Sequence, residues 1–257
     1  MRYDTFLSKT KRWTLIAVGF LFVFGIFATI QPVKAATDEE IALSLATLLR
    51  ASRAVIGKNQ KHINDPNVGD KGLSADVVVK AAKANYEKAA GHSLDSIDPK
   101  SAHGKLVQAE LNAIIEVMNA AQENINTKGK GLKGFLPAVF ARLVTQKFKT
   151  SAAGAATLKL TAPKAYVRNR ANRPDKWESN IIENKFRTAG HPKNQHVAEM
   201  GKVKGKDAYR LILPEYYKKG CLACHGEPKG EIDITGGKKE GGKLGEAGGA
   251  ISVVLFK

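Results

Sequence analysis

Ala250-Ile251-Ser252-Val253-Val254-Leu255-Phe256 closes the chain with an almost unbroken run of apolar residues. A short run of this kind, rich in β-branched side chains, is typical of a buried strand. Two earlier segments, 157–161 and 208–213, alternate between apolar and polar residues as half-buried strands do. The second half of the chain is therefore predicted to form a β-sheet, with the terminal run inside it.

Ahead of these strands, the sequence predicts helices. Apolar residues recur at helical spacing over 38–60, 75–90, 105–122 and 137–149. Thr37 and Glu40 form a capping-box pattern, Ser74 can cap the second helix, and Pro137 suits the first turn of the fourth. The expected fold class is α+β, with a helical N-terminal half.

The helical half contains an internal repeat. Gln60-x-x-Ile63-Asn64, followed by Lys71-Gly72, recurs 62 positions later as Gln122-x-x-Ile125-Asn126, followed by Lys133-Gly134. Each copy follows one helix and precedes another. Two similar loops framing one site would explain the repeat. The alternative is shared helix-exit chemistry, in which Asn turns the chain and Gly accepts a positive φ.

Both cysteines of the chain lie in one pentapeptide, Cys221-Leu222-Ala223-Cys224-His225. Cys-x-x-Cys-His is the attachment pattern of c-type haem. The thiols add across the two vinyl groups and must project toward one edge of the porphyrin. Residues three and four apart share a face of a helical turn, so the cysteines can hold the ring while His225 presents a nitrogen to the iron. This predicts one covalently bound haem c.

Three other interpretations of the cysteine pair remain. A thioredoxin-type dithiol and a simple structural disulfide both suit the spacing. Half of a zinc site is the third, but four-coordinate zinc usually recruits a second Cys or His pair at short spacing, and the sequence contains none.

The N-terminal residues indicate export. Basic residues within the first 12 positions precede an apolar run over 13–30, and small residues follow at 35 and 36. This order is typical of a secretory signal peptide, with cleavage after Ala35. An uncleaved anchor is the alternative, because 18 apolar residues just suffice to span a membrane. We expect a signal peptide or anchor at 1–35, a haem domain at 36–257, and a periplasmic location, free or anchored to the inner membrane.

The chain is strongly basic. Its net charge is +17, and +13 without residues 1–35. Such a surface can steer docking to an acidic redox partner or an anionic membrane face. A solvated lysine-rich surface without a partner is equally consistent. Nucleic acid is not expected as a partner of an exported chain, and membrane insertion is expected only through residues 13–30, if they stay uncleaved.

Several segments together resemble the c-type haem proteins with a PAS-like fold, a family long catalogued as a domain of unknown function. Such domains occur alone in exported proteins and as sensing regions of signalling proteins. The resemblance spans nearly the whole mature chain and is carried by residues 59–65, 133–140, 158–163, 168–169, 173–175, 214–217, 221–230, 239–242 and 249–252.

The resemblance implies a PAS-like antiparallel sheet with flanking helices. It also implies covalent haem at Cys221 and Cys224, with His225 as the proximal ligand. Redox sensing, gas sensing and electron transfer all remain open within the family.

The second axial ligand would decide between these functions. A strong protein ligand suits electron transfer, whereas an open position admits a diatomic gas. His62, inside the first repeat loop, is the leading candidate. The other candidates are His92, His103, His191, His196, Met118 and Met200. An open or water-ligated iron is the alternative.

Four further residues are expected near the haem. Arg168 and Arg173 can pair with its propionates, because a guanidinium matches a carboxylate. Tyr216 and Tyr217 directly precede the motif, so that one can pack on the porphyrin and the other bond a propionate. Glycines over 236–249 suit close backbone approach or tight turns. A solvated loop and ordinary core packing are the alternatives.

Together these features predict an exported monohaem c-type cytochrome that acts in electron transfer or as a haem-based redox or ligand sensor. We recognise no output domain, so a sensor would need a separate signalling subunit. The alternatives are a haem peroxidase-like enzyme, which needs a distal His or Arg over the iron, and a haem-free Cys-x-x-Cys thiol oxidoreductase.

Overall fold

The computed structural model describes residues 35–257, which form one compact unit. The predicted signal peptide or anchor occupies 1–35, so apart from Ala35 it lies outside the described residues. Between residues 35 and 257, no helix is both long and apolar enough to cross a membrane.

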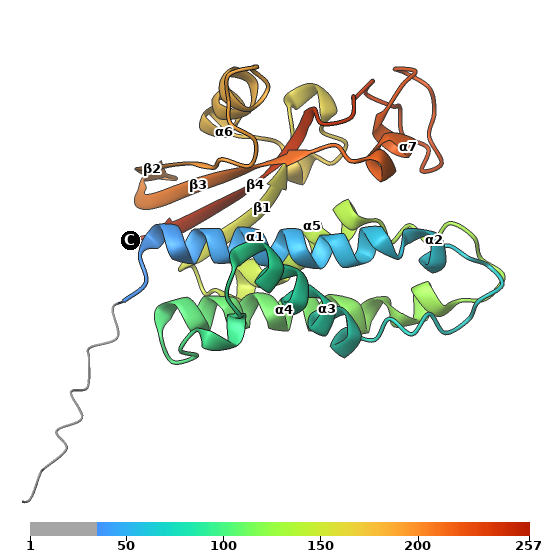
Figure 1. Cartoon of the computed structure of the whole chain (residues 1–257), viewed down its shortest axis with the longest axis horizontal. Coiled ribbons are helices and arrows are strands. Elements are labelled where there is room, and N and C mark those ends of the chain that lie inside the picture. Colours follow the sequence, from blue (N-terminus) through green and yellow to red (C-terminus); the bar gives the residue numbers. More distant parts are fainter. Residues whose placement is uncertain (1–34) are drawn as a thin grey trace, which may run out of the picture. The chain divides into compact units, whose positions relative to one another are not determined.

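Helices come first in this unit and the sheet follows, which confirms the α+β fold class (Figure 1). The helices are α1 (Asp38–Lys58), α2 (Gln60–Ile63), α3 (Ala75–Ala90), α4 (Ala102–Asn126), α5 (Pro137–Ser151), α6 (Lys176–Ile181) and α7 (Leu222–His225). The strands are β1 (Ala156–Thr161), β2 (Val197–Val203), β3 (Lys206–Tyr216) and β4 (Ala247–Phe256).

The predicted helix starts are confirmed in detail. Thr37 and Glu40 form the reciprocal capping box at the start of α1. The Ser74 hydroxyl accepts from the backbone N–H of Val77 at the start of α3, and Pro137 is the first residue of α5. These caps satisfy N–H groups that have no partner within their own helix.

The strands form one antiparallel sheet in the order β1-β4-β3-β2. The terminal run that predicted a buried strand is part of β4, whose residues are buried from Ala247 to Leu255. Alternate side chains of a strand face opposite sides. Ile251 and Val253 accordingly join the main core with the helices, whereas Ala250 joins a smaller core on the other face.

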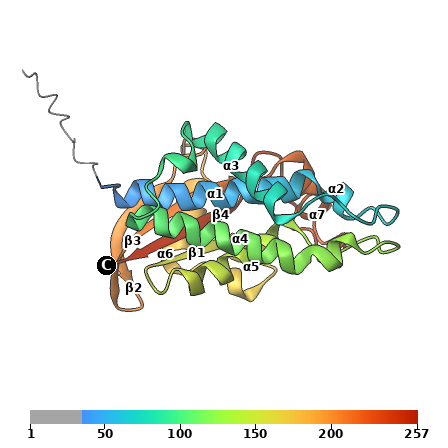
Figure 2. The same ribbon diagram turned by 90° about the horizontal axis from the view of Figure 1, so that it is seen from below.

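Both faces of the sheet are covered, as Figures 1 and 2 show. Helices α1 and α5 pack against one face, and α3 and α4 pack behind them as a second helical layer. Helix α6 covers part of the other face through Ile181. Two ion pairs fix α1 to the sheet. Arg50 Nε binds one carboxylate oxygen of Glu215 at 2.5 Å, and Arg53 Nη1 binds the other at 2.6 Å.

Strand β2 was not predicted from the sequence. It is a half-exposed strand at the edge of the sheet, so it lacks the apolar alternation that identified the others. The sequence signal that could have revealed this strand lies in the turn that follows it. Lys204 and Gly205 have φ of 52° and 82° and are the only residues between β2 and β3. Two positive φ values in a two-residue loop are the geometry that favours a β-hairpin.

The repeated segments form two equivalent loops, which we call the paired loops (residues 60–73 and 122–135). Gly72 and Gly134 occupy the same place in each, with φ of 61° and 70°. Side chains with a Cβ rarely adopt such values. The repeated Lys-Gly therefore marks the same turn in both loops.

Each paired loop is held by the other through matching hydrogen bonds. The Asn64 and Asn126 side-chain oxygens accept from the opposite loop, from the backbone N–H of Lys133 at 3.1 Å and of Lys71 at 3.0 Å. The Gln60 and Gln122 amides also cross, donating to the carbonyls of Phe135 at 3.3 Å and Leu73 at 3.0 Å. Each of these four bonds has a counterpart 62 positions along the chain, so the repeat reflects a reciprocal contact rather than coincidental helix-exit chemistry.

Within each paired loop, a buried lysine ties the backbone together. The Lys71 ammonium donates to the carbonyls of Asp65 and Val68, and the Lys133 ammonium to those of Thr127 and Lys130. Burying an ammonium without partners would be costly, and these carbonyls compensate for it.

Candidate functional site

The cysteine motif lies just beyond the end of β3. A short 3₁₀ turn at Lys219–Cys221 leads into α7, and the Cys221 N–H donates to the Lys218 carbonyl at 2.8 Å. Cys221 has helical φ and ψ, so both cysteines and His225 belong to one helical turn, as the spacing predicted. Both thiols are free and half-buried. The motif is thus available for bonds to a group outside the chain.

His225 is held from two directions. Its Nδ1 lies 2.8 Å from Oε2 of Glu240, and its carbonyl accepts from the Gly242 N–H at 2.7 Å. A carboxylate on Nδ1 fixes the proton there, which leaves Nε2 as the nitrogen able to bind a metal.

Arg168 gathers the segment that surrounds α7. Its guanidinium binds Glu240 Oε1 and Asp233 Oδ2, both at 2.5 Å, and also donates to the Cys224 and Lys238 carbonyls. Burial opposes the ionisation of Asp233, but hydrogen bonds from Thr235 and Arg168 hold its pKa well below the usual value. For Glu240, burial is likewise outweighed by the bonds from Arg168 and His225, and the pKa is lowered.

Tyr217 packs behind the imidazole in a slot lined by glycine. Its ring stacks on that of His225, with centroids 5.3 Å apart and planes 16° apart. A Cβ added at Gly242 would lie 2.3 Å from the ring, and one at Gly248 would lie 2.2 Å from it. Only glycine therefore leaves room for Tyr217 at these two positions. Burial raises the pKa of the Tyr217 hydroxyl, which stays protonated at neutral pH.

The other predicted haem contacts lie in different places. Arg168 is beside the motif, but it binds Asp233 and Glu240 rather than facing outward to a propionate. Arg173 is an exposed residue next to α6, and its carbonyl accepts from Lys159. Tyr216 packs against the smaller core, and its contact with a haem stays a prediction.

His62 has a role within the paired loops. Its Nε2 lies 3.0 Å from the Lys71 carbonyl. Asn124, at the equivalent position of the second loop, bonds the Lys133 carbonyl in the same way at 2.8 Å. Figures 1 and 2 both place α2 at the same end of the unit as α7. Its ring is bonded within its own loop, and its role as an axial ligand stays a prediction.

The remaining histidine candidates for the second axial position have other neighbours. His92 meets Tyr86, and His103 is buried in α4. His191 bonds the Gln195 carbonyl, and His196 pairs with Glu39 of α1. Met118 is fully buried in the main core, and Met200 is exposed on β2. Among residues 35–257, no three His, Cys, Asp or Glu residues are grouped as a metal site.

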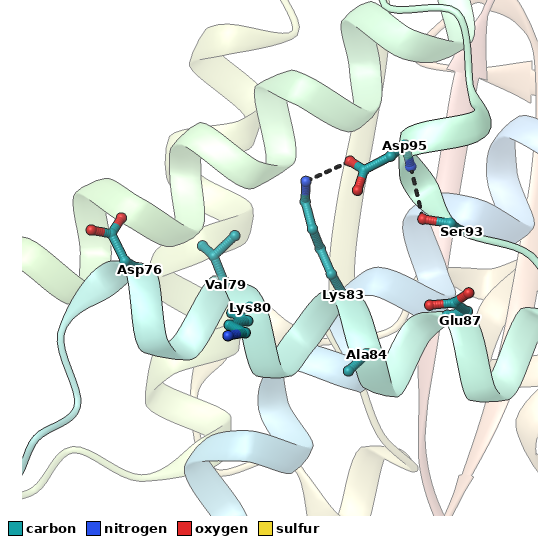
Figure 3. A pocket seen from close by; sticks show the side chains of 8 residues that line it. All are labelled: Asp76, Val79, Lys80, Lys83, Ala84, Glu87, Ser93 and Asp95. Carbon is teal, nitrogen blue, oxygen red and sulfur yellow. Dashed lines mark hydrogen bonds and ion pairs between the residues drawn. The ribbon is translucent and has the colours of Figure 1, made fainter.

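A separate hollow of about 400 Å³ lies along α3, lined among others by Asp76, Lys83, Glu87 and Asp95 (Figure 3). Lys83 crosses it to pair with Asp95 at 2.6 Å. Ligand pockets are mostly apolar with a few convergent polar groups. Most of the residues that line this hollow are charged, and it includes none of the predicted site residues.

The residues around α7 fit a c-type haem. Two free thiols share one helical turn with an imidazole whose Nδ1 is already bound. Burial, and after it the charge of Asp233, raises the pKa of the Cys224 thiol, whereas catalytic dithiols have lowered thiol pKa values. The arrangement therefore suits thioether attachment better than thiol–disulfide exchange.

The comparisons with known proteins give one match. The family model described as Tll0287-like matches residues 100–255, which is more than half of the chain and includes α7. No curated protein and no solved structure matches.

Proposed function

Because the chain belongs to the Tll0287-like family, we propose that residues 36–257 form a c-type cytochrome domain that exchanges single electrons with a separate protein. One haem would be bound through thioether bonds to Cys221 and Cys224, with His225 as an axial ligand. The observation that supports this most is the contact between His225 Nδ1 and Glu240 at 2.8 Å. It leaves Nε2 free for the iron and gives the imidazole the carboxylate partner that metal-binding histidines commonly have.

The residues of the site suit this chemistry. If haem is attached, each cysteine S–H would add across a vinyl group: the S–H bond and the vinyl π bond would break, one C–S and one C–H bond would form, and no oxidant would be needed. The iron would supply a one-electron couple between its ferric and ferrous forms. Glu240 keeps the proton on Nδ1, while Tyr217 in its glycine slot supports the flat face of the imidazole.

The enzyme alternatives find less support. The raised pKa of the Cys224 thiol disfavours a dithiol oxidoreductase. A peroxidase would need an arginine or histidine poised over the iron. Arg168, which lies beside the motif, is bound instead to two carboxylates.

We place this activity in the periplasm. Residues 1–35 have the pattern of a signal peptide, and covalent haem attachment by this motif takes place outside the bacterial cytoplasmic membrane. In this proposal the chain meets the membrane only if residues 13–30 stay uncleaved.

Mass spectrometry of the exported protein tests the proposal. After co-expression with the haem c attachment machinery, we expect each chain to carry the added mass of one haem, whether or not the signal is removed. The double variant Cys221→Ala/Cys224→Ala should carry none. A wild-type mass equal to that of the polypeptide alone would falsify the proposal.

We further propose an acidic redox partner. Exposed lysines surround α7: Lys218, Lys219, Lys229, Lys238 and Lys243. Three of the exposed large apolar side chains lie in the same segment: Ile232, Ile234 and Leu244. An apolar centre with a charged rim is the usual anatomy of a protein–protein contact, and positive charge steers association with an acidic surface.

Small oxidants of opposite charge test this electrostatic steering. Oxidation of the ferrous protein by ferricyanide should slow about tenfold as salt rises from low to physiological strength or above. Oxidation by a cationic cobalt tris-phenanthroline complex should instead become faster as salt rises. Lys219→Gln should lower the ferricyanide rate more than Lys88→Gln, an equal charge change at an exposed position on α3. Equal effects of the two variants would count against a docking face at α7.

A further inference from the structure

Glu240 is fixed at both of its carboxylate oxygens. Oε1 binds Arg168 Nε at 2.5 Å, and Oε2 lies 2.8 Å from His225 Nδ1. Only 7% of its side chain is exposed. A carboxylate bound at both ends in a protected position cannot turn away from the imidazole without breaking an ion pair.

Arg168 is itself anchored, so the contact rests on a rigid frame. The Asp233 side chain that binds it is 0% exposed. The other oxygen of Asp233 accepts from the backbone N–H groups of Thr235 at 2.7 Å and Gly237 at 3.2 Å. This series of contacts runs from the backbone of one loop through Asp233, Arg168 and Glu240 to His225. Each of its links includes a carboxylate, which makes the hydrogen bonds charge-assisted and directional.

A carboxylate behind an axial histidine has a specific chemical effect. It draws on the Nδ1 proton and makes the imidazole a stronger donor to the metal. A stronger donor favours the more highly charged ferric state, and the nearby negative charge acts in the same direction. A neutral hydrogen-bond partner at Nδ1 would orient the imidazole without favouring the ferric state.

From this geometry, and resting on the proposed function, we infer that Glu240 is a positioning residue for His225 that lowers the reduction potential of the haem. Arg168 and Asp233 support it by holding the carboxylate in place. No step of haem attachment requires Glu240, so the potential can change while the haem remains bound.

A potentiometric titration of Glu240→Gln tests this inference. The amide keeps an oxygen acceptor for Nδ1 but removes the charge. We expect the equilibrium constant for one-electron reduction to rise about tenfold, which corresponds to about 59 mV. The matched control is Glu231→Gln, which removes the same charge from the same loop, from a side chain that is 50% exposed and paired with Lys239. For this control we expect the equilibrium constant for one-electron reduction to change less than twofold.

The possible outcomes separate the two proposals. If the wild-type chain carries no haem, the proposed function fails. If haem is attached in both variants and their potentials shift equally, the inference about Glu240 is overturned while the proposed function stands. Should the glutamine variant fail to fold, Glu240→Asp replaces it, because it keeps the charge but withdraws the carboxylate by one methylene. We then expect about a threefold rise, and a potential equal to that of the wild type would overturn the inference.

Discussion

The variant Glu110→Met is expected to be more stable than the wild-type protein by about 2 kcal/mol at pH 7. Glu110 is 0% exposed in α4, and neither of its carboxylate oxygens has a hydrogen-bond partner. Burial raises its pKa well above the usual value, so the folded protein holds the side chain in its neutral form. Methionine has a similar shape and no polar group to desolvate.

The same residue predicts how stability depends on pH. Unfolding returns Glu110 to a pKa of about 4.3, so at higher pH the unfolded chain releases a proton that the folded protein keeps. Folded-state stability should therefore fall as pH rises above that value, by up to about 1.4 kcal/mol per pH unit until the folded pKa is reached. Glu110→Met removes this contribution, so its advantage over the wild type should grow between pH 5 and pH 7.

Denaturant unfolding at several pH values measures both effects. Glu116→Met is the matched control, since it lies on the same helix, its side chain is 51% exposed, and its carboxylate pairs with Lys147 at the surface. It should change the free energy of unfolding by less than about 0.5 kcal/mol. Loss of stability in Glu110→Met, independent of pH, would mean that the buried carboxyl has a stabilising partner.

Gly248→Ala is expected to destabilise the protein by about 3 kcal/mol. Its new methyl group would lie 2.2 Å from Cζ of Tyr217, a separation that side chains do not tolerate. Gly248 lies in β4 between Ala247 and Gly249, which are both paired with β3, so the tyrosine ring is expected to leave its slot. Its stacking on His225 would be lost with it.

A double-mutant cycle tests this explanation. In a Tyr217→Ala background the clash is absent, so Gly248→Ala should then cost less than about 1 kcal/mol, and the coupling between the two sites should exceed about 2 kcal/mol. Gly190→Ala is the control, because nothing lies within 4 Å of its added Cβ. If Gly248→Ala is equally costly in both backgrounds, steric contact with Tyr217 is not its cause.

Much of the fold could be predicted because the signals were local. The capping box at Thr37, the cap at Ser74 and Pro137 each mark a helix start within a few residues. The run at 250–256 identified β4, since a strand buried on both faces has few polar positions. Strand β2 has no such signature. Its exposed residues, including Glu199 and Met200, are ordinary surface residues, and its place in the sheet comes from pairing with β3.

The candidate site likewise has a part that local spacing predicted and a part that it did not. Cys221, Cys224 and His225 lie within one turn, so their spacing alone predicted that they share a helix. Glu240 and Arg168 were not assigned their contacts in advance, because 15 and 57 residues separate them from His225 and no periodic pattern connects them. Only the folded loop brings them together. Glycines that the sequence suggested for close approach do serve that purpose, but their neighbour is a tyrosine of the same chain.

The reciprocal hydrogen bonds of the paired loops resemble an isologous interface, in which each of two equal partners offers the other the same groups. Surface connections usually accept insertions and deletions readily. Here the Asn126 side chain accepts a hydrogen bond from the first loop, and the Lys133 N–H donates one to it. A single added residue between Asn126 and Lys133 would displace both groups. The lengths of these two connections are thereby coupled, so that any natural change in one should be accompanied by a compensating change in the other.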